Sequence, residues 1–255
     1  MTWRVPPFDQ AIAELEVYVQ ATWNPIGLVV SGSIVRGEAG PTSDLDVFVV
    51  HDEPWRLREQ RWFAGVPAEL FVNPPTRIRH YFASEHAEGR PSTAHMFATG
   101  EVLGVPPGSP HPVLADLVRE ARDWLARPVA LTPAQLVARR YAAVDVLDDA
   151  RDVIHDDPAA AHLLLASAVS SIVAYAFLGR GKFQPRRKRA VAALVELDPA
   201  AGDLVRRWAA QSGRDALTTV EELARHVLGV DTFFAWASDR DPVAAGASTA
   251  DPTEA

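Results

Sequence analysis

The sequence predicts an α+β protein: a small mixed sheet with flanking helices, followed by an all-helical bundle. Short apolar runs typical of buried strands occur in the first half, whereas every periodic segment from His111 onward has helical spacing. A proline-rich stretch at 105–112 separates the two patterns. We therefore expect one domain at residues 1–108 and a helical domain at 109–238, with a disordered tail at 239–255 that has little to bury.

Three apolar runs are the expected strands: residues 26–31, 45–50 and 67–72. The second run is rich in β-branched residues, which favour strands. The third is followed by Asn73-Pro74-Pro75, a sequence that ends regular structure. The helices expected in the first half cover residues 8–22, 53–63, 78–88 and 93–99.

The second half contains five expected helices. Thr132 and Pro133 are an N-cap and a first-turn proline, so a helix should begin there and reach about residue 156. The apolar stretch 163–178 is rich in Ala and Ser and is shorter than a membrane span, which favours a buried helix. The remaining expected helices cover residues 159–178, 188–196, 200–211 and 215–237.

Composition limits the function classes. The formal net charge of −8 disfavours non-specific binding to duplex nucleic acid, which needs many Lys and Arg contacts to phosphate. The absence of cysteine excludes disulfides and thiolate metal sites. The first residues lack the apolar core of a secretory signal, and we expect a cytoplasmic protein without a membrane or nucleic-acid partner.

One segment carries recognisable chemistry, beginning with a glycine and a serine after the first strand. Gly32 would let a phosphate approach the backbone, because no side chain stands in the way. Ser33 would follow at a helix N-terminus, where free amides and its hydroxyl face an anion. Arg36 lies in the same loop and is a further candidate phosphate ligand, or else a surface charge. Gly37 would permit the turn back to the sheet.

Asp44 and Asp46 are separated by one residue at the start of the second strand. Side chains alternate across a strand, so both carboxylates should point to one face. Carboxylates this close repel each other unless a cation lies between them, and hard oxygen ligands suit Mg²⁺. The pattern predicts two-metal phosphoryl or nucleotidyl transfer. Glu69, a charged residue inside the third apolar run, is the expected third metal ligand and the base that takes the acceptor proton.

At these residues the chain resembles the nucleotidyltransferase superfamily related to DNA polymerase beta. The motif of that superfamily is Gly-Ser, a short stretch, Gly, and then Asp-x-Asp, matched here by Gly32, Ser33, Gly37, Asp44 and Asp46. The resemblance implies transfer of a nucleoside monophosphate, most simply AMP from ATP, to a hydroxyl. It also implies a requirement for Mg²⁺ and pyrophosphate as the product.

The plan of a small catalytic domain followed by helices also resembles the aminoglycoside nucleotidyltransferases, which confer antibiotic resistance. The resemblance implies a small cationic acceptor such as an aminoglycoside. In some relatives the base comes from the helical domain, so that possibility stays open beside Glu69. A row of aspartates spaced four, three and four apart would form an acidic wall for a polycationic acceptor, or simply a solvated helix face. The row comprises Asp145, Asp149, Asp152 and Asp156.

A basic cluster follows the apolar helix, at residues 180–189. Within it, Lys182 and Lys188 are candidate ligands for the triphosphate; the alternative is a solvated loop. Two other functions remain open: an antitoxin-type nucleotidyltransferase that modifies a protein, and a noncatalytic nucleotide-binding module. The spacing from Arg151 to His155 does not fit the ribonuclease motif of helical partners of such antitoxins.

Overall fold

The computed structural model describes residues 6–40, 42–104, 111–238 and 240. Nearly all of the expected tail, and most of the proline-rich stretch, lie outside the described residues. The chain forms two compact units: Met1–Ala130 together with Arg180–Arg187, and Leu131–Gly179 together with the chain from Lys188 onward. This division differs from the expected boundary at residue 108, because the first unit also takes a helix and a short returning segment.

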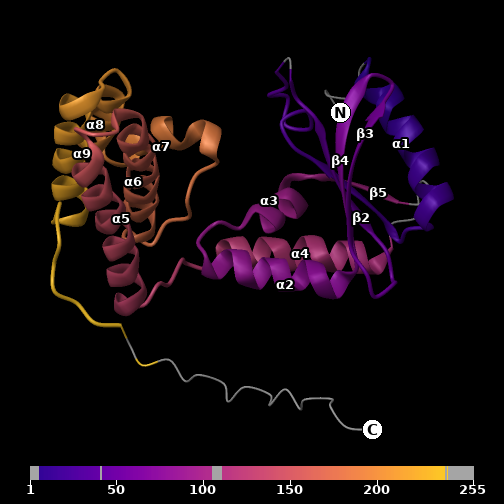
Figure 1. The fold of residues 1–255 in the computed structure, drawn as a ribbon. Helices are drawn as coiled ribbons and strands as arrows, with labels where there is room; N and C mark the ends of the chain where they lie inside the picture. The colour runs from indigo at the N-terminus through magenta and orange to yellow at the C-terminus, as the bar shows by residue number, and fades with distance from the viewer. Residues whose placement is uncertain (1–5, 41, 105–110, 239, 241–255) are drawn as a thin grey trace, which may run out of the picture. The chain divides into compact units, whose positions relative to one another are not determined.

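The first unit contains the predicted mixed sheet, which has five strands where the sequence analysis expected three (Figure 1). The strand order is β3-β4-β2-β1-β5. Only β2 and β4 pair in parallel; the other neighbours are antiparallel. The strands are β1 (Gly27–Ser31), β2 (Leu45–Val50), β3 (Leu57–Phe63), β4 (Val66–Asn73) and β5 (Glu101–Gly104).

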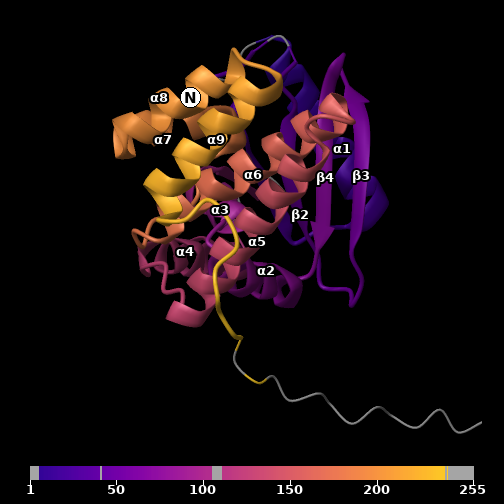
Figure 2. The ribbon, with the colours of Figure 1, turned by 60° about the vertical axis from the view of Figure 1, so that its left-hand side comes forward.

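Helices cover both faces of this sheet (Figures 1 and 2). Val47 and Val49 of β2 are buried in the core that contains α1, whereas Phe48 and Val50 are buried in the core that contains α2, α3 and α4. The alternation of these four apolar residues explains why β2 is buried on both sides. The helices are α1 (Phe8–Trp23), α2 (Pro75–Ala87), α3 (Ser92–Thr99) and α4 (Pro112–Ala126).

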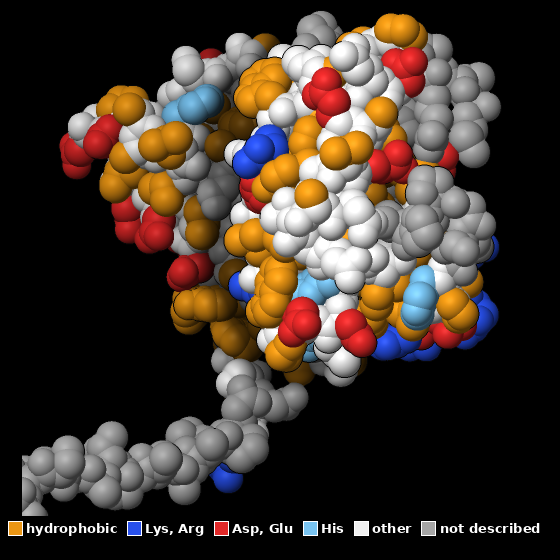
Figure 3. Space-filling view, turned by 90° about the vertical axis from the view of Figure 1, so that its right-hand side faces the viewer, with side chains coloured by type: hydrophobic (Ala, Val, Ile, Leu, Met, Phe, Trp, Pro, Cys, Tyr) orange, Lys and Arg blue, Asp and Glu red, His pale blue; other side chains and the backbone are white. Residues whose placement is uncertain are grey.

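The outward side of α1 is polar with scattered apolar residues. Figure 3 views the molecule from the side of α1 and shows acidic and hydrophobic side chains interspersed over this face. Asp9 and Glu14 are exposed on α1, as is Val17, whereas Leu15 and Val19 are buried. The helical spacing in the sequence therefore identified the side of α1 that packs on the sheet.

The helix predicted at residues 53–63 is wrong, since most of this segment forms β3. Ala64 and Gly65 both have positive φ, 45° and 77°, as in a two-residue type I′ hairpin that returns the chain to β4. β3 lies at the edge of the sheet and stays largely exposed, so it lacks the apolar alternation that marks a strand. Strand β5 was not predicted, because it has only four residues.

The second unit consists of helices, as predicted. The Thr132 hydroxyl accepts from the amide of Gln135, and the Gln135 side chain accepts from the amide of Thr132, which completes a capping box. The last helix ends at Leu228 because Gly229 has a φ of 75°, so its predicted extension to residue 237 is wrong. The elements are α5 (Pro133–Val153), α6 (Pro158–Leu178), the 3₁₀ turn Arg187–Arg189, α7 (Ala190–Leu197), α8 (Pro199–Ala209) and α9 (Gly213–Leu228).

Helix α6 is long and apolar enough to cross a membrane by length and composition. Its buried residues, among them Leu165, Val169 and Ile172, belong to a core shared with α5 and α9. Residues such as Leu147 of α5 and Leu223 of α9 line the same core. This packing agrees with the buried helix expected from the sequence.

Candidate metal and phosphate site

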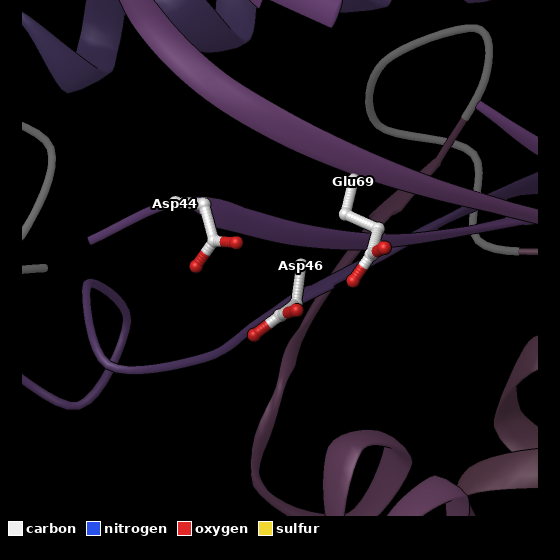
Figure 4. A group of neighbouring side chains, drawn as sticks. All are labelled: Asp44, Asp46 and Glu69. Atoms are coloured by element: carbon white, nitrogen blue, oxygen red, sulfur yellow. The ribbon is translucent and has the colours of Figure 1, made fainter. Parts of the chain in front are cut away.

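Three carboxylates meet on one face of the sheet: Asp44, Asp46 and Glu69 (Figure 4). One carboxylate oxygen from each lies within 4.8 Å of the others. Asp44 immediately precedes β2, Asp46 is on β2, and the parallel register of β2 and β4 places Glu69 opposite Asp46. The structure thus brings together the three acids that the sequence singled out, from adjoining strands.

Alternation along β2 separates these acids from the core beneath α1. Leu45 and Val47 are fully buried on the opposite face, as expected. The acids themselves are only partly buried. They can therefore face a bound group while the same strands remain anchored in the core.

The pKa of Asp46 is raised in this cluster. Burial raises its pKa from 3.8 to about 6, and the neighbouring charges of Asp44 and Glu69 add to the rise. The charges of Arg36 and Arg58 act in the opposite direction without cancelling it. A divalent cation bound among the three oxygens would relieve this repulsion, and an all-carboxylate donor set suits Mg²⁺.

Glu69 is held in place by the neighbouring strand. Its Oε1 accepts from Arg58 Nε at 2.7 Å and from Gln60 Nε2 at 3.3 Å, and Arg58 also forms an ion pair with it. Both partners lie on β3, the strand that the sequence analysis took for a helix. Arg58 and Gln60 are two residues apart, so they share one face of β3. This spacing is the sequence signal that could have placed both beside Glu69, had the segment been recognised as a strand.

Gly32 directly follows β1 and lies beside Asp46. Its φ is +98°, and a Cβ built there would lie 2.6 Å from Asp46 Oδ2. Any other residue would therefore strain the backbone and collide with the acid. The structure thus gives a reason for glycine that the sequence analysis did not: Gly32 makes room for Asp46. Its role in admitting a phosphate stays a prediction.

The helix expected after Gly32 is reduced to a single turn. The amide of Gly37 donates to the carbonyl of Ile34 at 3.0 Å, and the amide of Glu38 donates to that of Ser33 at 2.8 Å. These paired bonds, with Gly37 at a φ of +72°, form a helix-terminating Schellman motif. One turn has no appreciable dipole, so the phosphate binding predicted here would rest on amides, hydroxyls and cationic side chains.

Two hydroxyls join the turn to the segment before Asp44. Ser33 Oγ and Ser43 Oγ are 2.8 Å apart, and the amide of Gly40 donates to Ser43 Oγ at 2.8 Å. At the other end of the turn, Ser31 Oγ donates to the carbonyl of Asp46 at 3.3 Å. The turn is therefore fixed to β2 on both sides of the acids.

Two arginines lie at the outer side of the turn. Glu38 accepts from Arg36 Nε at 3.0 Å and from Arg186 Nη1 at 3.3 Å, and the hydrogen bond from Arg36 is the largest cause of its lowered pKa. Burial, together with the charges of Arg186 and Arg36, lowers the pKa of His95 on α3. The basic cluster thus reaches the turn through Arg186, which the sequence analysis did not select.

Among the residues that the structure describes, no contact at the turn supports the other two predicted phosphate ligands, Lys182 and Lys188. Lys182 is exposed in the first unit, and Lys188 belongs to the second unit, so their roles remain predictions. The aspartate row is exposed and also belongs to the second unit. Three of its members lie on α5, whereas Asp156 follows that helix, which ends at Val153 and not near residue 156 as expected. The row is Asp145, Asp149, Asp152 and Asp156.

Comparison with known proteins agrees with this geometry. Residues 12–78 match a family model described as a nucleotidyltransferase domain. The matched segment runs from α1 into α2 and includes the glycine turn and all three carboxylates. It supports a transferase of this class.

Among solved structures, the chain is similar to a nucleotidyltransferase-like protein from Exiguobacterium sibiricum 255-15. The TM-score is 0.50 and the identity 12%, over 86% of this chain and 74% of that one. A likeness at this identity supports the fold, with sheet and helices in this order. No curated protein matches the chain.

The raised pKa of Asp46 predicts a pH-dependent stability. The folded protein holds this proton more tightly than the unfolded chain, so the metal-free free energy of unfolding should fall as pH rises from 3.8 to about 6. The loss is up to roughly 3 kcal/mol. Asp46→Asn should therefore be more stable than wild type in EDTA at pH 8, with a smaller difference at pH 4, as measured by urea unfolding.

Asp52→Asn, at an exposed position outside the triad, is the control and should show no such gain. Mg²⁺ or Mn²⁺ at pH 8 should raise the melting temperature of wild type and not that of Asp46→Asn. Equal stability of wild type and Asp46→Asn at pH 8 would contradict the repulsion described above.

Gly32→Ala and Gly37→Ala form a matched pair, since both glycines have positive φ. Gly32→Ala should lose roughly 1–3 kcal/mol and also weaken nucleotide binding, because its Cβ meets Asp46. Gly37→Ala has open space around the new Cβ and should lose only about 1 kcal/mol. Urea unfolding and titration with a nonhydrolysable ATP analogue measure both effects; indistinguishable variants would refute the close-approach argument.

Proposed function

We propose that this protein transfers a nucleoside monophosphate, AMP from ATP, to a hydroxyl of a small acceptor and releases pyrophosphate. The observation that carries the proposal is the meeting of Asp44, Asp46 and Glu69 beside the turn at Gly32. The nucleotidyltransferase match over residues 12–78 supports the same chemistry. The cytoplasmic location expected from composition remains part of the proposal.

The three carboxylates would hold divalent metal, two Mg²⁺ ions in our proposal. Such ions, when bound, neutralise charge on the phosphate oxygens and make a nearby hydroxyl more acidic. The perturbed pKa of Asp46 fits this role, because a site that is costly to ionise alone becomes favourable once a cation is present.

The polyphosphate would lie on the turn. Gly32 leaves its backbone open, the Ser33 hydroxyl can donate, and Arg36 and Arg186 already bind a carboxylate, Glu38, at the outer side. A phosphate has the same charge sign and a similar arrangement of oxygens, so it can take the place of that carboxylate.

Glu69 would orient the acceptor hydroxyl and take its proton. The contacts from Arg58 and Gln60 converge on Oε1, which fixes the direction of the carboxylate. A fixed base contributes to rate because it does not have to be reoriented at each turnover.

A second candidate acceptor class is polycationic, such as an aminoglycoside. The observation that favours it is the row of exposed aspartates on and just after α5. No observation on the described residues favours modification of a protein partner, the antitoxin-type alternative. Arg151, the arginine of the incomplete ribonuclease motif, is paired with Glu221 and Asp148.

Pyrophosphate release from ATP with Mg²⁺ tests the proposal, with amino, carboxylate and neutral hydroxyl compounds offered as acceptors. Asp46→Asn and Glu69→Gln should each reduce the rate by a factor on the order of 10³ or more. Glu59→Gln is the matched control, since Glu59 lies on β3 but bonds Tyr18 on the α1 face. A fully active Asp46→Asn would refute the assigned metal site.

Arg186→Gln tests the phosphate contact separately. Losing a charge-assisted bond should raise the KM for ATP by about tenfold with little change in kcat, if the contact is made equally before and during transfer. Arg187→Gln, one residue further along and also exposed, should leave the KM unchanged. Equal effects of the two variants would assign Arg186 to general surface charge.

A further inference from the structure

A cavity of about 630 Å³ lies on the same face of the sheet as the triad. It is lined by residues of the first unit alone, from β2, β3, β4, α2, α3 and the segment before β3. A volume of this size suits a small organic molecule. The proposed transfer leaves the cavity without a role.

The cavity begins where the triad ends. Phe48 and Phe71 line it, and they lie two residues beyond Asp46 and Glu69 on the parallel strands, roughly 7 Å further along the same face. The turn at Gly32 lies in the other direction, because β1 runs antiparallel to β2 and Ser31 pairs with Asp46. The triad therefore separates the phosphate turn from the cavity.

This order suits an in-line displacement. The attacking oxygen and the departing pyrophosphate lie on opposite sides of the transferred phosphorus. With pyrophosphate on the turn at Gly32, the attacking hydroxyl must approach from beyond Glu69, which is where the cavity opens. The cavity is accordingly placed for the acceptor.

Three apolar side chains lie together in the wall of the cavity. The rings of Phe48 and Phe71 stack with centroids 5.0 Å apart and planes 20° apart, and Met96 of α3 lines the cavity with them. The Arg58 guanidinium lies over Phe71 at 5.0 Å. Because β4 lies between β3 and β2, Arg58 and Phe48 cover opposite faces of the Phe71 ring. An apolar molecular body would therefore pack against the ring edges and Met96.

The available charges in the cavity are positive. Arg56 Nη1 donates to the Tyr81 hydroxyl at 2.9 Å, and both residues line the cavity. Glu85 is the acid of the lining, but its two oxygens accept from the amide and the hydroxyl of Thr93 at 2.6 and 2.7 Å. Its charge is thus used to cap α3, and it does not form a site for a cationic ligand.

We propose that this cavity binds the acceptor, and that the acceptor is a small apolar molecule that carries a carboxylate. The carboxylate pairs with Arg56. The body packs against the ring edges of Phe48 and Phe71 and on Met96. The hydroxyl of the acceptor points to Glu69. This inference rests on the proposed function. In the step itself, the acceptor oxygen forms a bond to the α-phosphorus, the bond to pyrophosphate breaks, and the hydroxyl proton passes to Glu69.

Two probes that share a ring and a hydroxyl test the inference without turnover: 4-hydroxyphenylacetate, an anion, and tyramine, a cation. Binding to the full-length protein is measured by ligand-observed NMR, with and without a nonhydrolysable ATP analogue and Mg²⁺. We expect the anion to bind at least about tenfold more tightly than the cation. Arg56→Gln should abolish this preference, and Arg56→Lys should restore part of it.

Arg61→Gln is the matched control, because Arg61 lies on β3 but contacts Tyr18 on the α1 face. It should leave binding of both probes unchanged. Tighter binding of tyramine, equal effects of Arg56→Gln and Arg61→Gln, or displacement of the anion by the ATP analogue would each overturn the inference. Displacement would assign the cavity to the nucleotide. Because binding is measured without catalysis, a protein that binds the anion but releases no pyrophosphate would refute only the proposed transfer.

Discussion

The parallel pairing of β2 with β4 is the constraint on which the site depends. It sets Asp46 directly opposite Glu69, so close that the two carboxylates repel each other. Folding supplies the energy that holds these like charges together, through the apolar residues that alternate with them, such as Val47 and Leu70. The core beneath α1 thus holds the carboxylates together against their mutual repulsion, which a bound cation would reduce.

The remaining parts of the site are arranged around that pair. Gly32 has no side chain where Asp46 needs space, and the hairpin through Gly65 brings Arg58 back to Glu69. Arginines on both sides limit the negative charge without abolishing it, since the pKa of Asp46 remains high. The result is a local excess of negative charge flanked by cations, which is suited to a complex of metal and polyphosphate.

The sequence was sufficient for the parts of the fold with strong periodicity. The buried strands, the capped helix at Thr132 and the spacing of Asp44 and Asp46 all express a pattern within a few residues. The edge strand β3 escaped prediction because its long polar side chains satisfy helix propensity, and only pairing with β4 makes it a strand. Arg186 likewise could not be chosen from its neighbours, because its contact with Glu38 spans 148 residues of chain.

Glu38 occupies the two arginines beside the turn at Gly32. Glu38 already offsets one of the two positive charges of Arg36 and Arg186, so a nucleotide bound as we propose would take over contacts that a carboxylate makes first. The binding free energy gained from these contacts is then the difference between the attraction of the arginines to the phosphate and their attraction to Glu38. Added salt weakens both attractions. Nucleotide affinity should consequently depend less on ionic strength than the number of arginines around the turn would suggest, and selection between nucleotides must come from contacts beyond the phosphates.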